Sequence, residues 1–231
     1  MDMLRILLLS LLTVSLFQCK DTSIPLPFGA EMRIMPVDTT GKGSIDTNGY
    51  YIPEKGNYRV LYIEIDKNGN GSSDEFIWQG HATFQDPKTP SVRTMMKVHE
   101  QVDENNDGKI DLIRWLLPND LIAMTQKDSD HDGYFETTNH YNIRKKIVRK
   151  EIDSTKKGTP SIFIFSDRAE IDSDGDFIPD KVVFGGSDLE LEEKAINMRE
   201  TKPLLSKDSL LVNPELLKRD ERPILGSGSL K

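Results

Sequence analysis

The chain has 231 residues, a formal net charge of -8 and a sequence pI near 5.1. Binding to nucleic acid requires a basic face, so this charge argues against nucleic acid as a partner. Apolar residues make up 36% of the chain, which is enough for a core, and the length favours one domain with tails.

The N-terminal residues have the pattern of an export signal that ends in a lipidated cysteine. Residues 6–17 are an unbroken run of apolar, Ser and Thr residues, the length of a signal-peptide core and too short to span a bilayer comfortably. Cys19 follows in the sequence SLFQCKD, which resembles a bacterial lipobox, in the relaxed form of spirochaete lipoproteins. The resemblance implies a signal peptide over residues 1–18 and lipidation of Cys19. Three prolines and few strand formers after the cysteine indicate a lipidated tether over residues 19–36.

These expectations place the protein outside the cytoplasm. The lipid on Cys19 would anchor it to the membrane of a bacterial cell envelope, at the outer membrane, the cell surface or the periplasmic face. Since the chain has one cysteine, no disulfide framework is available, and the exported domain must be held by core packing, by metal, or by both.

The middle of the chain has the pattern of strands and turns. Residues 57–65, 94–102 and 160–167 are short segments with β-branched or aromatic residues, each near a cluster of Asp, Asn and Gly. No helical period is sustained between residues 37 and 184. We therefore expect an all-β domain over residues 37–186, a meander of strand–loop–strand hairpins curled into a sandwich or barrel-like sheet. An incomplete β-propeller is the alternative.

The C-terminal residues differ from this pattern. Ser187 is followed three residues later by Glu190, which is a capping-box pattern, and Leu189 and Ile196 are spaced to share one helical face. The residues after this segment contain three prolines and the sequence GSGS. The sequence therefore predicts a short helix and an irregular or disordered tail over residues 187–231.

Four segments can be written in one register, which indicates an internal repeat. They are DKNGNGSSD from residue 66, DENNDGKID from residue 103, DSDHDGYFE from residue 128 and DSDGDFIPD from residue 172. Positions one, three and five are always Asp or Asn, position nine is always an acid, and position six is Gly in the first three. Position thirteen carries a ring in every copy: Trp78, Trp115, His140 and Phe184. A shared downstream position indicates a repeated strand–loop–strand unit rather than four unrelated polar turns.

The spacing suits calcium, which takes six to eight oxygen ligands at about 2.3–2.6 Å. Alternate side chains of a tightly curled loop can point at one ion, and glycine at position six lets the backbone reverse. The expected ligands are Asp66, Asn68, Asn70, Asp74, Asp103, Asn105, Asp107, Asp111, Asp128, Asp130, Asp132, Glu136, Asp172, Asp174, Asp176 and Asp180. The alternative is that the loops are ordinary hairpin turns, for which Asn-Gly and Asp-Gly are common signals.

Two known kinds of calcium loop resemble these segments. Residues 103–113 are similar to the loop of FG-GAP and VCBS-type repeats, and the copy from residue 172 is similar to a thrombospondin type 3 loop, with Phe177 where Gly is usual. The loops also resemble the start of an EF-hand loop, but none has its glutamate at position twelve. These resemblances imply calcium held in hairpin loops of an extracytoplasmic β-protein, and they imply no catalytic activity.

The number of acids ranks the four loops. The loop from residue 128 combines four acids with Gly133, so the sequence predicts that it binds calcium most tightly. A further segment from Asp38 has the same spacing, but Lys42 at its fifth position would repel a cation, so we expect a plain turn there.

The chain shows no catalytic motif, and we expect no enzyme. The sequence favours a calcium-binding lipoprotein that acts as a surface or periplasmic binding or adhesion module, with a protein or a glycan as its partner. A purely structural envelope protein is one alternative, and a hydrolase with an unrecognised acidic site is another. Trp78 and Trp115 could line a binding face, but aromatics at matching strand positions are more often core.

Overall fold

A computed structural model of the chain describes residues 23–25, 31–55, 57–86 and 89–225. Cys19 and the expected signal peptide lie outside the described residues. Among the described residues, no helix is long and apolar enough to cross a bilayer.

The described strands form one antiparallel sheet in which each strand pairs with its neighbours along the chain. The first half of the sheet consists of β1 (Ser23–Pro25), β2 (Glu31–Val37), β3 (Thr47–Glu54), β4 (Asn57–Ile65), β5 (Glu75–Asp86), β6 (Thr89–Val102) and β7 (Leu112–Leu117). The second half consists of β8 (Leu121–Lys127), β9 (Thr137–Tyr141), β10 (Ile147–Ile152), β11 (Ile162–Ile164), β12 (Arg168–Ile171), β13 (Lys181–Phe184) and β14 (Lys202–Pro203).

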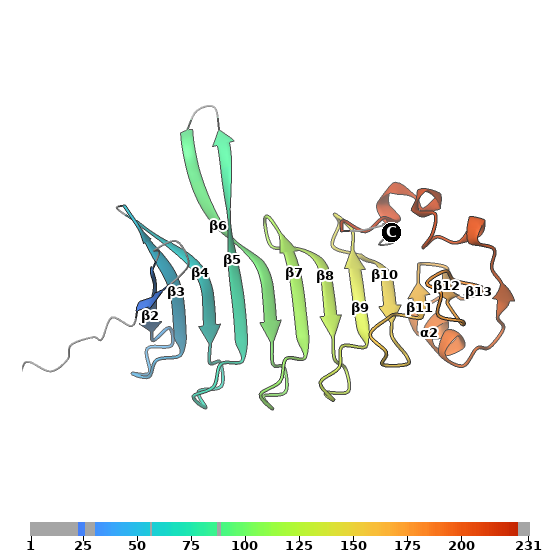
Figure 1. Cartoon of the computed structure of the whole chain (residues 1–231), viewed down its shortest axis with the longest axis horizontal. Coiled ribbons are helices and arrows are strands. Elements are labelled where there is room, and N and C mark those ends of the chain that lie inside the picture. The colour runs from blue at the N-terminus through green and yellow to red at the C-terminus, as the bar shows by residue number, and fades with distance from the viewer. Residues whose placement is uncertain (1–22, 26–30, 56, 87–88, 226–231) are drawn as a thin grey trace, which may run out of the picture.

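The all-β hairpin meander predicted from the sequence is confirmed. Its expected closure is not found, because the described strands form a single open sheet with β1 and β14 at its edges, rather than a sandwich, a barrel or propeller blades (Figure 1). The sheet also begins before residue 37, since residues 31–37 of the expected tether form β2. Pro36 is tolerated in this strand, which lies close to one end of the sheet.

Helix α2 (Asp188–Ile196) covers one face of the sheet over β11, β12 and β13. The predicted cap is confirmed, because the Oγ of Ser187 accepts a hydrogen bond from the backbone N–H of Glu190 at 3.3 Å. The predicted apolar face is wrong: Leu189 is 78% exposed, whereas Leu191 and Ala195 are buried against the sheet. Residues four apart lie on one side of a helix, and here that side is the one that meets the strands.

The buried residues that α2 shares with the sheet form one core cluster. Its members are Ile152, Ile162, Ile164, Ala169, Ile171, Val183, Leu191 and Ala195. The strands beneath the helix therefore alternate in the way expected of a sheet that buries this face.

The C-terminal residues cover the opposite face of the same strands. Leu210 and Leu217 pack on Phe163 and Phe165 in a second cluster. The buried carboxylate of Glu170 accepts hydrogen bonds from the Oγ of Ser209 and from the backbone N–H groups of residues 210 and 211. The tail has little regular structure beyond short 3₁₀ turns at Ser206–Asp208, Pro214–Leu216 and Arg219–Glu221, but as far as residue 225 it is ordered on the sheet rather than disordered.

The strands from β3 to β9 have no such cover among the described elements, as Figure 1 shows. One face of this part carries a row of rings, in which Tyr62, Trp78, His99 and Trp115 are consecutive cross-strand partners. The exposed fraction of Trp115 is 39%, and the other three side chains are partly exposed. The expectation that Trp78 and Trp115 belong to a core is therefore wrong, because no described element packs on them as a second layer.

Candidate functional site

Six loops lie side by side at one end of the strands, where they form every second connection between strands (Figure 1). They are residues 38–46, 66–74, 103–111, 128–136, 153–161 and 172–180, each nine residues long. We call them the edge loops and name each by its first residue. Neighbouring edge loops are separated by two strand spacings, about 9–10 Å.

All six edge loops have the same backbone conformation. The fourth residue has a positive φ in each, at Gly41, Gly69, Asn106, His131, Lys156 and Gly175. The sixth residue also has a positive φ in each, at Gly43, Gly71, Gly108, Gly133, Gly158 and Phe177. Glycine adopts this left-handed region without strain, which explains five of the six residues at the sixth position. Phe177, with φ of 69°, is the strained exception.

The first residue of every edge loop is an aspartate that holds this conformation. Its carboxylate accepts a hydrogen bond from the backbone N–H of the sixth residue, over donor–acceptor distances of 2.6–2.9 Å. In five loops the acid at position nine accepts in turn from the backbone N–H of the second residue. The two acids thus satisfy N–H groups that a tight loop would otherwise leave unpaired.

Backbone hydrogen bonds join each edge loop to the next. The carbonyl of the ninth residue accepts from the N–H of the next loop's first residue, for example from Asp103 to Asp74 at 2.8 Å and from Asp128 to Asp111 at 2.8 Å. This bond recurs between all five neighbouring pairs of loops. The edge loops therefore form one continuous array rather than independent turns.

Two of the six loops differ from the sequence interpretation. Loop 38 was expected to be a plain turn, but Asp38 accepts from Gly43 as its counterparts do, so it belongs to the array. Loop 153 has no acid at its third, fifth or ninth position and was missed. Its detectable signal was Asp153 followed at position six by Gly158, the two residues that fix the loop conformation.

The expected calcium ligands fall into a buried and an exposed set. Those at the first and ninth positions are buried or partly buried against their own loop: Asp66, Asp103, Asp128, Asp172, Asp74, Asp111, Glu136 and Asp180. Those at the third and fifth positions are exposed: Asn68, Asn105, Asp130, Asp174, Asn70, Asp107, Asp132 and Asp176. An ionised carboxylate has about four acceptor sites, so an oxygen that accepts a backbone N–H can still bind a cation.

Loops 128 and 172 each bring three acids together. Oxygens of Asp172, Asp174 and Asp176 lie within 4.8 Å of one another, and so do oxygens of Asp128, Asp130 and Glu136. These two groups are the ones in which the described His, Cys, Asp and Glu residues gather at metal-binding distances. Both groups lie within predicted calcium loops.

Loops 66 and 103 do not form such a group among the described residues. In loop 66 the amide nitrogen of Asn68 donates to Asp74 at 2.9 Å and to Asn106 of the next loop at 2.8 Å. In loop 103 the amide nitrogen of Asn105 donates to Asp107 at 3.2 Å. Both amides point nitrogen rather than oxygen at their partners, which does not suit a cation.

The fourth residue of several edge loops reaches back to the preceding loop. Nδ1 of His131 lies 2.9 Å from Oδ1 of Asp111. The hydrogen bond with Asp111 raises the pKa of His131. Burial raises the pKa of Asp111, but hydrogen bonds from His131 and from backbone N–H groups outweigh burial and lower it.

Lys156 is the fourth residue of loop 153, and its ammonium group lies against loop 128. Its Nζ is 3.1 Å from Oδ2 of Asp130 and also contacts Asp132. The hydrogen bond from Lys156 lowers the pKa of Asp130, and the hydrogen bond to Asp132 raises the pKa of Lys156. In loop 128, which the sequence ranked first for calcium, two acids are thus already paired with the ammonium group of a lysine from the neighbouring loop.

Loop 172 lacks such a counter-charge. No ion pair joins Asp172, Asp174 or Asp176 to a lysine or arginine within the described part of the chain. A backbone hydrogen bond from Asp176 lowers the pKa of Asp174, but burial and the charges of Asp176 and Asp180 outweigh this bond and raise it. Crowded carboxylates that are not neutralised attract a cation more strongly than a set that is already paired.

The comparisons with known proteins add little to this site. No protein-family model and no curated protein matches the chain. Among solved structures, the crystal structure of TarM contains a chain that is 12% identical over 57% of this chain, with a TM-score of 0.34. The match covers 21% of that chain.

Proposed function

We propose that the protein is an exported, lipid-anchored envelope protein whose edge loops bind calcium and whose sheet binds a partner outside the cytoplasm. The export signal and the anchor at Cys19 are inferred from the sequence pattern, because both lie outside the described residues. The calcium part of the proposal is supported by the geometry of the loops.

The observation that carries the proposal is the group of acids in loop 172. Asp172, Asp174 and Asp176 present oxygens within 4.8 Å of one another on a loop whose backbone is fixed by its neighbours. Oxygen ligands from alternate residues of a tight loop are the donor set of a calcium site, whereas zinc requires His or Cys. Calcium bound there would remove the repulsion that raises the pKa of Asp174.

The proposal reverses the order of affinities expected from the sequence. Loop 172 becomes the tightest site because its clustered acids form no ion pair with a lysine or arginine among the described residues. Loop 128 becomes the second, because Lys156 must move away from its acids before an ion can enter. Loops 66 and 103 follow, since their acids are fewer or are bonded to asparagine amides. Loops 38 and 153 serve as structural members of the array, with Lys42 and Lys157 at the fifth position, where an ion would need an oxygen.

The test is a calorimetric titration of calcium into the purified, metal-stripped protein, paired with melting curves. We expect saturable binding and a raised melting temperature, because an ion that binds only the folded state at a concentration of about 100 Kd stabilises that state by roughly 2.7 kcal/mol per site. Magnesium at the same concentration is the competing cation, and it should bind more weakly because it requires octahedral geometry.

Matched variants identify the site. Asp174→Asn with Asp176→Asn should remove the tightest binding step. Asp188→Asn with Asp208→Asn removes the same charge at exposed positions outside the edge loops and should leave that step unchanged. If both double variants lost the same amount of calcium affinity, the net charge of the protein alone would set that affinity. An absence of binding heat in the unmodified protein would overturn the calcium proposal.

A further inference from the structure

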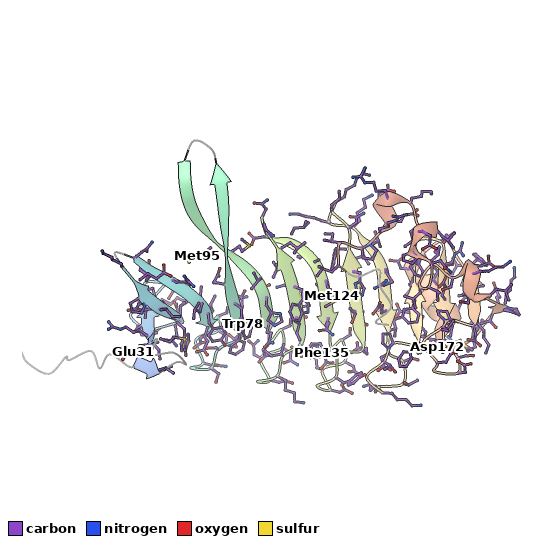
Figure 2. All side chains as sticks on the ribbon, turned by 45° about the horizontal axis from the view of Figure 1, so that its top comes forward. Glu31, Trp78, Met95, Met124, Phe135 and Asp172 are labelled. Atoms are coloured by element: carbon purple, nitrogen blue, oxygen red, sulfur yellow. The ribbon has the colours of Figure 1, made fainter. Side chains whose placement is uncertain are left out.

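One face of the uncovered strands carries a continuous row of rings. The distances between ring centroids are 5.2 Å from Tyr50 to Tyr62, 4.8 Å from Tyr62 to Trp78, 4.8 Å from Trp78 to His99 and 4.3 Å from His99 to Trp115. These residues come from the five neighbouring strands β3 to β7. We call this row, with Phe76 beside it, the aromatic face. Trp78 lies on β5 near the end that carries the edge loops (Figure 2).

A cavity of about 300 Å³ opens where the aromatic face meets loops 66 and 103. Rings of Tyr62, Phe76 and Trp78 line it, together with the carboxylate-bearing Asp103. Its volume is at the small end of the roughly 300–1,000 Å³ typical of ligand pockets, so it suits a small group. Three rings and one acid around a small cavity have the composition of an aromatic cage for an organic cation.

The distribution of charge over this part of the sheet favours a cation. Between β4 and β7, the residues that share the face of Trp78 include Glu64, and Arg59 near the start of β4 shares it as well but pairs with Glu54. Lys97 and Arg114 lie on the other face, where they pair with the buried Glu100. Burial lowers the pKa of His99, so this ring adds no positive charge near neutral pH.

The polar groups beside the rings are already paired with one another. The hydroxyl of Tyr50 donates to Glu64 at 2.8 Å, and the amide nitrogen of Gln101 lies 3.1 Å from Nε2 of His99. A sugar needs free donors and acceptors around its hydroxyl groups. A quaternary ammonium group needs none, because it binds through ring faces and charge.

We propose that this cavity binds a quaternary or methylated ammonium group, of the kind carried by choline, its ring faces provided by Tyr62, Phe76 and Trp78. The inference rests on the proposed function, since it assigns a ligand class to the binding module. It also links the two sites, because Asp103 lines the cavity and is the first residue of an edge loop.

Intrinsic fluorescence can test this directly, since the two tryptophans of the chain, Trp78 and Trp115, both lie on the aromatic face. In the Trp115→Phe protein, Trp78 is the single reporter. Choline chloride should change its emission saturably, with sodium chloride as the ionic-strength control. The neutral isostere 3,3-dimethylbutan-1-ol has the same shape without the charge, and it should bind at least tenfold more weakly.

Two variants separate charge from packing. Glu64→Gln keeps the shape of the side chain and should weaken choline binding several-fold, and Phe76→Leu should weaken it by a similar or larger factor. Melting curves and circular dichroism establish that both variants are folded. Met124→Leu, farther along the same face, should leave choline binding unchanged.

A calcium titration of the same samples keeps the two proposals apart. Calcium binding without choline binding would overturn the ammonium inference and leave the calcium proposal standing. Equal affinity for the neutral isostere would overturn the inference in favour of a plain apolar pocket. Binding of a neutral oligosaccharide that depends on Phe76, without choline binding, would overturn it in favour of a glycan site.

Discussion

At the residue scale, Lys156 decides how loop 128 meets a cation. We predict that Lys156→Met raises the calcium affinity of loop 128 by about tenfold, because the ammonium group that repels the ion is gone while the length of the side chain is kept. The carboxylates of Asp130 and Asp132, which now pair with Lys156, would become available to bind the ion. Calorimetric titration of the variant measures the change as a tighter second binding step.

An exposed lysine outside the edge loops is the matched control. Lys207 is exposed and forms no ion pair among the described residues, so Lys207→Met removes the same charge away from the array. Its calcium affinity should stay within about twofold of the unmodified protein, given screening at an exposed position. An equal gain in both variants would show that net charge, and not the occupancy of loop 128, sets the affinity.

At the element scale, α2 stabilises the C-terminal end of the sheet through a single face. We predict that Leu191→Ala lowers the free energy of unfolding by about 3 kcal/mol, because this fully buried side chain would leave a cavity between the helix and the sheet. Leu189→Ala makes the same chemical change at a side chain that is 78% exposed and should cost less than about 0.5 kcal/mol. Urea denaturation of the two variants provides the comparison, and similar costs would mean that α2 is not held by this face.

The sequence predicted the elements better than their environments. The segment 57–65 is a strand with the predicted bounds, and the helix begins at the predicted cap, because both depend on local chemistry. The buried face of α2 was predicted wrongly, since it depends on where the sheet lies, which no local pattern of Leu189 and Ile196 records. Trp78 was expected in a core for a related reason: alternation along a strand does not tell whether a second layer covers it.

The candidate site shows the same limit. The spacing of Asp, Asn and the ninth-position acid located four edge loops, including loop 172, where Phe177 replaces the glycine of the sixth position. Loop 153 escaped because a search for calcium ligands asks for acids that Thr155, Lys157 and Ser161 do not supply. The contact of Lys156 with loop 128 could not be predicted, since it depends on how two loops are placed side by side by the register of the strands.

At the scale of the whole molecule, the aspartates of the edge loops make the stability of the fold depend on pH. Burial raises the pKa of Asp153, but hydrogen bonds from Tyr134, Gly158 and Thr155 outweigh burial and lower it to about 2. The pKa values of Asp38, Asp46, Asp111 and Asp180 in other edge loops are lowered as well, by hydrogen bonds that exceed the cost of burial. A lowered pKa in the folded state contributes stability above the unfolded value of about 4, and this contribution is lost as the pH falls toward 2.

Two substitutions in calcium-free buffer should therefore have opposite signs. Asp153→Asn should lower the free energy of unfolding at pH 7 by roughly 2 kcal/mol, since it weakens hydrogen bonds to a charged group, and the deficit should shrink between pH 4 and pH 2. The pKa of Asp174 is raised, so its ionised form opposes folding at neutral pH. Asp174→Asn should accordingly stabilise the protein at pH 7, and the gain should disappear as the pH falls below about 4, where the carboxyl is protonated in both states. Urea midpoints at pH 7, 4, 3 and 2.5 measure both trends. If Asp174→Asn also lowered the free energy of unfolding at pH 7, the charges of loop 172 would not oppose folding, and the loop would have no need of an ion.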